Sequence, residues 1–410
     1  MDLATFNWLL SDAGQALIAA AAAGDLSEGA RLRELTRLRR LADPARAAAA
    51  YELARLRRHA AAKFAGAASM YFTREALEQS SGELIAGYRA RRYQPFARVA
   101  DLCCGIGGDT LALARVAQVA AVDRDPLRLA IAAANARAAG LAERVTFIEG
   151  DLVDLRLPAA EAIFFDPARR ADGRRAFTLA GYQPPVTLVG RWSAHTPAIG
   201  VKAAPGLSDA DLAGLAEQLG RPALEAEFIS VDGELKEAAL WFGPLASPGR
   251  RATLLTSARP DQPAHMHTRD SAGPAPLAPP GAFLYEPDPA VIRAHLVAGL
   301  AQQIGAAQLD REIAYLTSDQ PIATPFARCW RVLEWLPFSL KRLRARLRAL
   351  DAGAVTVKKR GSPLDTDALA RQLSAGGPRP LVVILTFVAG RPAALICEGP
   401  IAPPAAPHQR

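Results

Sequence analysis

The spacing of hydrophobic positions along the chain changes near residue 96. Before it, leucine and alanine recur every three or four residues, as in "RLRELTRLRRL" and "ARAAAAYELARLRRHAAAKF", with arginine on the other faces. This spacing predicts helices with one apolar side, and Pro44 stands where a helix can begin. We therefore expect an N-terminal helical region over residues 1–95.

Short apolar runs alternate with helix-length stretches over residues 96–257. Seven runs are predicted strands: "RVADL", "QVAAVD", "RVTFIE", "EAIFFD", "AIGVKA", "EAEFISV" and "EAALWFG". Helix-length connections between the first five indicate right-handed βαβ units, and Asp232-Gly233 is typical of a hairpin between the last two. The expected fold class is α/β, a Rossmann-like, doubly wound, mostly parallel seven-stranded sheet with one reversed edge strand.

The remainder of the chain predicts a linker and a further domain. Residues 258–282 are rich in proline, alanine and glycine and have no period, which favours a linker. The strand patterns "AVTVKKRG", "PLVVILTFVAG" and "RPAALICEG" and the helix pattern "DTDALARQL" predict a small α+β domain over residues 283–400. Residues 401–410 are expected to form a disordered tail. His265 and His267 lie in the linker, and we expect no metal site there.

Composition narrows the class of protein. Of the 410 residues, 50% are hydrophobic and 22% are charged, which is typical of a globular protein. The four cysteines have no CxxC spacing, which suits a reducing cytoplasm and predicts neither a zinc site nor a disulfide framework. Neither a signal peptide nor a membrane span is predicted. The net charge of +8 permits a polyanionic partner, although an arginine-rich composition explains it equally well.

A glycine turn follows the first predicted strand, in "VADLCCGIGGDTLALA" at residues 99–114. A strand that leads through such a turn into a helix presents backbone N–H groups at the carboxyl edge of a sheet. A dinucleotide-binding turn has glycine or alanine at the sixth position of GxGxxG, and here that position, counted from Gly105, is Thr110. The turn therefore predicts a nucleoside site of another kind.

Acidic residues end four successive predicted strands: Asp101, Asp123, Asp151 and Asp166. Four acids suit a cationic nucleoside without phosphate, and S-adenosylmethionine carries a sulfonium and an ammonium group. Asp123 is placed to hold a ribose diol, Asp151 to meet an adenine edge, and Asp166 to lie beside the reacting group. The alternative is that such acids only cap helices, as we expect of Asp109.

Residues 99–170 resemble the class I S-adenosylmethionine-dependent methyltransferases in "DLCCGIGGDTLALA", "AVDRDPLRLAIAAANA" and "IEGDLVDL". The glycine turn and "MYFTREALEQSS" are similar to the branch that contains trimethylguanosine synthase. "FFDPARR" and the C-terminal "VTVKKRG" resemble a bacterial group that couples this domain to a THUMP-like domain, over roughly residues 45–400. The resemblance implies S-adenosylmethionine as cofactor. The cofactor-binding residues expected are Phe72, Thr73, Gln79, Asp101, Cys103, Gly105, Gly107, Asp109, Asp123 and Asp151.

The expected catalytic residues lie in "DPARR": Asp166, Pro167, Arg169 and Arg170. Asp166 can orient an exocyclic amine or accept its proton. The two arginines can hold a phosphate or carboxylate, or stack on a base; the alternative is a solvated loop. Amino-methylating relatives have a second proline and an aromatic residue here, and both are absent. The motif also resembles that of uracil C5-methyltransferases, but no nucleophilic cysteine follows before Cys329.

Three further groups of residues have more than one interpretation. Lys202 ends the fifth predicted strand and can face the same pocket or the surface. Tyr182 and Trp192 can stack on a base or belong to the core. The "GELKEAALWFG" segment resembles a signature of the same bacterial group, and no physical role follows for its Glu234, Lys236 and Glu237.

A basic amphipathic helix is predicted at "FSLKRLRARLRALD", with its leucines on one face. Its cations and those of "VTVKKRG" can form a surface that follows RNA phosphates, or a solvated face alone. The RNA-binding residues expected are Lys341, Arg342, Arg344, Lys358, Lys359 and Arg360.

The sequence therefore predicts a cytoplasmic S-adenosylmethionine-dependent methyltransferase that acts on a nucleotide of structured RNA, either tRNA or rRNA. Two alternatives stay open. One is a methyltransferase for a protein or a small anionic substrate. The other is a non-catalytic RNA-binding protein with a vestigial cofactor site. The sequence predicts no acceptor atom and no oligomeric state.

Overall fold

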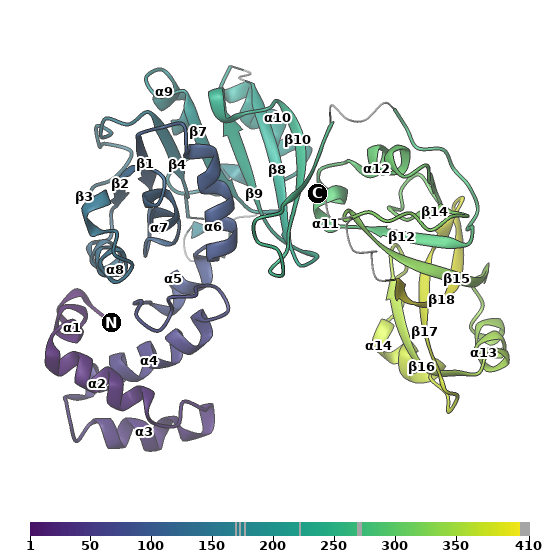
Figure 1. Ribbon diagram of the computed structural model, residues 1–410, viewed down its shortest axis with the longest axis horizontal. Coiled ribbons are helices and arrows are strands. Elements are labelled where there is room, and N and C mark those ends of the chain that lie inside the picture. Colours follow the sequence, from purple (N-terminus) through teal and green to yellow (C-terminus); the bar gives the residue numbers. More distant parts are fainter. Residues whose placement is uncertain (169, 172–173, 176–177, 221–222, 269–272, 402–410) are drawn as a thin grey trace, which may run out of the picture. The chain divides into compact units, whose positions relative to one another are not determined.

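The computed structural model describes residues 1–168, 170–171, 174–175, 178–220, 223–268 and 273–401 (Figure 1). The chain forms two compact units. The first consists of Met1–Glu225 with Ala238–Pro248, and the second of Ala226–Glu237 with Gly249–Arg410. The predicted boundary at residue 95 does not separate compact units, because the N-terminal helices and the parallel strands belong to the same one. No helix in the described part of the chain is long and apolar enough to cross a membrane.

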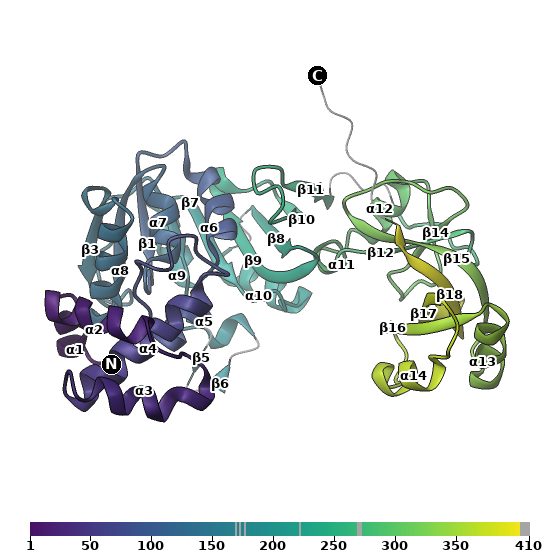
Figure 2. The same ribbon diagram turned by 60° about the horizontal axis from the view of Figure 1, so that its bottom comes forward.

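The chain begins with six helices, as the three- and four-residue spacing predicts. They are α1 (Leu3–Leu9), α2 (Asp12–Ala22), α3 (Arg31–Leu38), α4 (Pro44–Ala60), α5 (Arg74–Gln79) and α6 (Glu83–Ala90). Helix α4 begins at Pro44 behind Asp43, whose carboxylate accepts two backbone N–H groups. Phe6 and Tyr51 are buried in one apolar cluster with Ile131 of α8 (Pro126–Ala138), and Figure 2 shows α1 beside α8. The helical region is therefore anchored on the sheet domain.

A nine-stranded sheet has the order β11-β10-β8-β9-β7-β4-β1-β2-β3. The five parallel strands β1 (Arg98–Leu102), β2 (Gln118–Asp123), β3 (Val145–Glu149), β4 (Ala162–Phe165) and β7 (Ala198–Ala203) pair in register, and β9 (Glu234–Phe242) lies antiparallel to β7. The connecting helices besides α8 are α7 (Gly108–Ala114), α9 (Leu188–Ser193) and α10 (Asp209–Gln218). Asp232 and Gly233 both have positive φ between β8 (Leu224–Val231) and β9, as the predicted hairpin requires. The expected fold class is confirmed.

The sheet has two strands beyond the predicted seven, β10 (Gly249–Leu255) and β11 (Ala264–His267). They pair antiparallel, so the expectation of a linker over 258–282 is wrong at 264–267. Met266 and His267 are buried there. The local composition conceals this strand because four residues are too few to show a period, and its hydrogen-bonding partner lies elsewhere in the sequence.

The second unit contains a seven-stranded sheet in the order β13-β14-β12-β15-β18-β17-β16. Its strands are β12 (Phe283–Pro287), β13 (Ala307–Gln308), β14 (Leu316–Ser318), β15 (Ala327–Pro337), β16 (Ala352–Lys359), β17 (Arg379–Val388) and β18 (Arg391–Ile401). Its helices are α11 (Pro289–Arg293), α12 (Val297–Gln303), α13 (Leu340–Ala349) and α14 (Thr366–Leu373). Leu343 and Leu347 of α13 are buried with Leu369 of α14 in one cluster, which confirms the predicted leucine face. The tail predicted over 401–410 lies, from residue 402 onward, outside the described residues.

Candidate active site

The turn between β1 and α7 has a left-handed backbone at three positions: Cys103, Gly105 and Gly107, with φ of 63°, 56° and 87°. Glycine is needed at the last two for different reasons. A Cβ at Gly105 would have no atom within 4 Å, so this residue faces open space, whereas a Cβ at Gly107 would lie 3.3 Å from the Cβ of Ala132 on α8. Gly105 therefore forms an open backbone cradle, and Gly107 permits close packing of two helices.

Asp123, at the end of β2, is fixed by this turn. One carboxylate oxygen accepts the backbone N–H of Gly105 at 2.9 Å, and the other accepts the N–H of Asp125 at 3.0 Å. The residue is only 6% exposed. Each carboxylate oxygen has a second lone pair, so Asp123 can accept two further hydrogen bonds from a ligand in the cradle.

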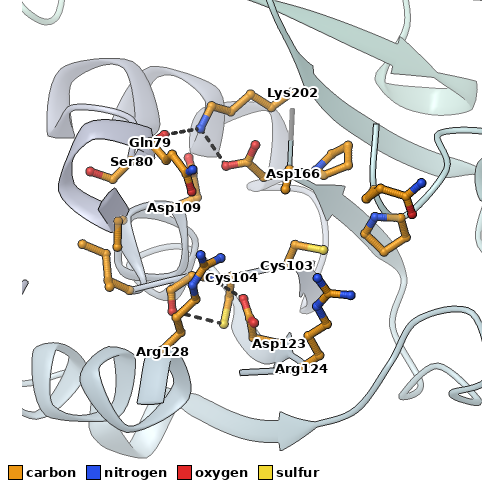
Figure 3. A pocket seen from close by; sticks show the side chains of 18 of the residues that line it. Gln79, Ser80, Cys103, Cys104, Asp109, Asp123, Arg124, Arg128, Asp166 and Lys202 are labelled. Carbon is orange, nitrogen blue, oxygen red and sulfur yellow. Dashed lines mark hydrogen bonds and ion pairs between the residues drawn. The ribbon is translucent and has the colours of Figure 1, made fainter. Parts of the chain in front are cut away.

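A pocket of about 500 Å³ opens above the turn (Figure 3). Its walls come from α5 and the residue after it, from the β1–α7 turn and from the carboxyl ends of β2, β3, β4 and β7. Among the described residues, the carboxylates in the lining outnumber the cationic groups. The acids are Glu78, Asp109, Asp123, Asp151 and Asp166, and the cations are Arg124, Arg128 and Lys202. The pocket therefore favours a cationic ligand.

Asp166 and Lys202 form an ion pair at one end of this pocket. The Lys202 Nζ lies 2.6 Å from Oδ2 of Asp166 and donates a second hydrogen bond to the carbonyl of Gln79 at 3.2 Å (Figure 3). The Lys202 side chain is 7% exposed and that of Asp166 is 28% exposed. Burial raises the pKa of Asp166 above its ordinary value, and the Lys202 ammonium opposes that rise. In the described chain no hydrogen bond to Oδ1 of Asp166 is found, so this oxygen can accept one from a substrate.

A second buried acidic group lies beneath the turn. Asp101 is fully buried, its Oδ2 accepts the hydroxyl of Thr110, and its Oδ1 has no hydrogen-bonding partner in the described chain. Burial, with a contribution from Asp109, raises the pKa of Asp101 to about 8. Asp109 does not cap α7 as expected. It forms an ion pair with the buried guanidinium of Arg89, which lies 4.8 Å from the ring centroid of Phe164.

The pocket lining contains some of the predicted cofactor residues and lacks others. Gln79, Cys103, Gly105, Asp109, Asp123 and Asp151 line it. Gly107 and Asp101 support the turn from behind. Phe72 and Thr73 do not line the pocket either: Phe72 is buried against Phe64, Thr73 caps α5 through its hydroxyl, and their expected contacts with the cofactor stay predictions. Their positions result from the packing of the N-terminal helices, which the motif alone does not specify.

The structure describes part of the loop that follows β4. Pro167 and Ala168 line the pocket, and Ala168 exchanges two backbone hydrogen bonds with Gln183. Arg169 lies outside the described residues, and the backbone of Arg170 belongs to the short strand β5 (Arg170–Ala171), which pairs with β6 (Arg174–Arg175). The roles expected of these two arginines stay predictions.

Tyr182 and Trp192, the two aromatic residues considered for base stacking, are both buried core residues. The Tyr182 hydroxyl accepts the backbone N–H of Ala204, and Trp192 packs edge-on against Phe165.

Sequence reasoning missed several pocket residues. Arg124 and Arg128 follow Asp123 closely, so their place in the chain was a usable signal. Gln183 gives no such signal, and neither does Arg89, which is buried outside the lining and pairs with Asp109, because each lies far in sequence from the groups it meets.

The predicted RNA-binding residues occupy two elements of the second unit. Lys341 and Arg342 are exposed on α13, and Arg344 donates to Gln372. Lys358 on β16 and Arg360, the residue after this strand, both form ion pairs with Glu286. Lys359 donates instead to the backbone carbonyl of Leu364. The basic side chains thus do not form one continuous free surface, because those of β16 are partly neutralised.

Three family models match separate parts of the chain. An RNA cap guanine-N2 methyltransferase family matches residues 96–177, a THUMP domain-like family matches residues 327–399, and a domain of unknown function matches residues 2–60. The first match includes Asp101, Gly105, Asp123 and Asp166, and the second includes α13 and β16.

Two relatives and one solved structure extend these matches. An uncharacterised S-adenosylmethionine-dependent methyltransferase of Mycobacterium tuberculosis is 38% identical over 352 residues, which cover 81% of this chain and 90% of the relative. The 23S rRNA (uracil(1939)-C(5))-methyltransferase RlmD of Acidithiobacillus ferrooxidans is 37% identical over 83 residues, 18% of this chain and 19% of the relative. A crystal structure described as a methyltransferase from Porphyromonas gingivalis superposes with a TM-score of 0.72 at 21% identity and covers 97% of both chains, which establishes a shared fold.

Proposed function

Because this chain belongs to the S-adenosylmethionine-dependent methyltransferases, we propose that it methylates a nucleotide of structured RNA, with Asp166 facing the acceptor. One observation carries the proposal: the Asp166 carboxylate lies in the segment that matches an RNA-methylating family, and it lines the same pocket as the Gly105 cradle. A pocket of about 500 Å³ is large enough for a cofactor of this class.

The residues of the pocket fit S-adenosylmethionine, which supplies a methyl group on a sulfonium. The open space at Gly105 admits the ligand close to the backbone. Asp123 holds the ribose hydroxyls through its remaining lone pairs, and Asp151, exposed at the pocket wall, meets the adenine edge. The excess of carboxylates stabilises the positive charge of the ligand. Asp101 is fully buried beneath the turn and does not line the pocket, so it supports the turn and does not contact the ligand.

Asp166 orients the acceptor and takes its proton. Lys202 holds Oδ2, so Oδ1 points to the substrate side and accepts a hydrogen bond from an exocyclic amine. The Lys202 ammonium also limits the rise in the pKa of Asp166 that burial causes, which keeps a larger fraction of the carboxylate ionised. Asp166 is thus the proposed catalytic residue, and Lys202 is a positioning residue.

Covalent catalysis by a thiolate fits this pocket poorly, although a uracil C5-methyltransferase is among the relatives. The two cysteines in the lining are Cys103 and Cys104. Burial raises the pKa of both thiols well above the ordinary value, so little thiolate is present at neutral pH. Transfer to an amine nitrogen needs no such nucleophile.

The C-terminal region supports RNA as the substrate class. Residues 327–399 match a THUMP domain-like family, and this region contains the exposed cations of α13. Cations outside a catalytic pocket bind phosphates without regard to base sequence. The second unit can therefore hold a large RNA while the pocket of the first unit acts on one nucleotide. In a reducing cytoplasm, the proposed location, the four free cysteines remain thiols.

Transfer of a tritiated methyl group to total RNA from cells that lack the gene tests the proposal. The wild-type protein should label RNA, and the label should be lost on nuclease treatment. Asp166→Asn should reduce turnover about 100-fold or more and change the affinity for S-adenosylmethionine by no more than a few-fold. Asp154→Asn is the matched control, because Asp154 is exposed and lies outside the pocket. Label in protein or small molecules, with none in RNA, would contradict the proposal.

A further inference from the structure

The second unit contains a pocket of about 1120 Å³ that the proposed methyl transfer does not use. Its walls are the β8–β9 turn, the segment after β10, the junction of β12 and α11, the loop at 321–325, and the ends of β15, β16 and β18. Every one of these elements belongs to the second unit. This pocket shares no lining residue with the one around Asp166.

Rigid apolar side chains form much of this wall. The proline residues in the lining are Pro287, Pro289, Pro321, Pro325 and Pro400, and the leucine and isoleucine residues are Leu254, Leu255, Ile322 and Ile401. Proline rings present flat apolar surfaces that lose little conformational freedom on binding. A wall of this kind accepts the face of an aromatic ring, as binding pockets for planar ligands do.

The acidic groups of the lining are already engaged. Asp232 accepts the N–H and the hydroxyl of Ser257 at 3.0 and 2.6 Å. Asp288 caps α11 by accepting the N–H of Ala290 at 2.8 Å, and its pKa is raised by burial. The third acid, Glu286, forms ion pairs with Lys358 of β16 and with Arg360, the residue that follows this strand. Hydrogen bonds from neutral groups do not remove the charge of a carboxylate, but the lining has four cations, Arg259, Arg328, Lys358 and Arg360, against three acids, so its formal charge is +1.

Two guanidinium groups in the lining have no such engagement. In the described chain, no hydrogen bond from the side chain of Arg328 or Arg259 is found, and both residues are exposed. Arg328 lies over the β8–β9 turn, where a Cβ on Gly233 would come within 2.6 Å of its Nη2. The charge of Arg328 makes a small contribution against the rise in the pKa of Asp288 that burial causes. The pocket thus combines available planar cations with flat apolar walls.

We propose that this pocket binds an unpaired nucleotide segment of the RNA substrate, with its phosphate on Arg328 and Arg259 and a base against the proline wall. The inference rests on the proposed function for the class of substrate, and it adds the place where that substrate is held. A guanidinium group can donate two hydrogen bonds to two oxygens of one phosphate. The bases of unpaired RNA can enter a pocket because they are not stacked within a double helix.

Fluorescence anisotropy tests whether RNA binds in this pocket. The full-length protein is titrated into a fluorescein-labelled, single-stranded RNA of eight nucleotides over a range of salt concentrations. Arg328→Glu should weaken binding about tenfold or more and make the dependence of log K on log salt shallower by about one unit. Arg259→Glu should act in the same direction. Arg331→Glu is the matched control, since Arg331 is exposed on the same strand, β15, and does not line the pocket. It should change affinity less than twofold.

A cross-linking experiment locates the RNA independently of these variants. RNA that contains 4-thiouridine should cross-link to peptides within residues 321–329. The inference would be overturned if Arg328→Glu and Arg259→Glu both bound RNA normally, or if Arg328→Glu and Arg331→Glu lost the same affinity. It would also be overturned if an acidic peptide bound through Arg328 while RNA did not. The proposed function fails separately, when the wild-type protein transfers no label to RNA. If label reaches RNA and the Arg328 variant binds normally, only the pocket assignment is lost.

Discussion

Gly105 and Gly107 offer a matched pair of substitutions that separates ligand binding from folding. Both residues have positive φ, 56° and 87°, so alanine at either position adds strain of about 1–2 kcal/mol to the folded state. The methyl group added at Gly107 also lies 3.3 Å from the Cβ of Ala132, which increases the loss of stability. We therefore expect Gly107→Ala to lower the free energy of unfolding at least as much as Gly105→Ala does.

The two variants should differ in the opposite sense in their affinity for S-adenosylmethionine. At Gly105 the added methyl group meets no protein atom within 4 Å and occupies the space that admits the ligand. At Gly107 it points at α8 and away from the pocket lining. Gly105→Ala should weaken binding of the cofactor at least tenfold, about 1.4 kcal/mol, and Gly107→Ala should weaken it no more than about twofold.

Urea denaturation gives the stability of each variant, and isothermal titration calorimetry gives its affinity for S-adenosylmethionine at a temperature where both variants are folded. Wild-type affinity in Gly105→Ala would refute the argument that the ligand lies against this turn. A loss of affinity in Gly107→Ala as large as that in Gly105→Ala would show that strain in the turn, and not the space above it, controls binding.

Three further substitutions test the charges around the pocket. Because the pKa of Asp101 is raised to about 8, the folded protein keeps a proton that the unfolded chain releases above about pH 4. The free energy of unfolding should therefore fall as pH rises from 4 to 8. Asp101→Asn should flatten this dependence, as measured by urea denaturation at each pH. Arg89→Met leaves Asp109 buried without its partner and should lower the free energy of unfolding, measured by urea denaturation, by about 3–5 kcal/mol. A loss below about 1 kcal/mol would contradict this prediction. Lys202→Met removes the ammonium that opposes the rise in the pKa of Asp166, so the rise of kcat/KM with pH should move to higher pH. An unchanged pH profile would show that Lys202 does not control the ionisation of Asp166.

The N-terminal helices, the seven strands and the glycine turn follow from the sequence because their signals are local. Side-chain spacing of 3.6 or 2 residues and the demand for positive φ act over a few neighbouring residues. The same holds for the acids: Asp123 and Asp166 end parallel strands, and such ends meet at one edge of a sheet, so their presence in one pocket was predictable.

The partners of these groups were not predictable in the same way. Lys202 meets Asp166 across 36 residues of sequence, and Arg89 meets Asp109 across 20. Strand β11 exists because β10 supplies its hydrogen bonds, although the surrounding segment has the composition of a linker. Each contact depends on how separate elements pack. Neither the type of a residue nor its spacing in the sequence specifies how close two such side chains lie in the folded protein.

The sequence by itself determined the fold class, the cradle at Gly105 and the acids that surround it, since backbone geometry within a strand, a turn or a helix fixes these. Only the tertiary structure decided which charges are paired and which are left available, such as Oδ1 of Asp166 and the guanidinium of Arg328. The physical reason is that an ion pair or a pocket requires atoms from distant segments within a few ångströms, and that proximity arises only when the core has packed.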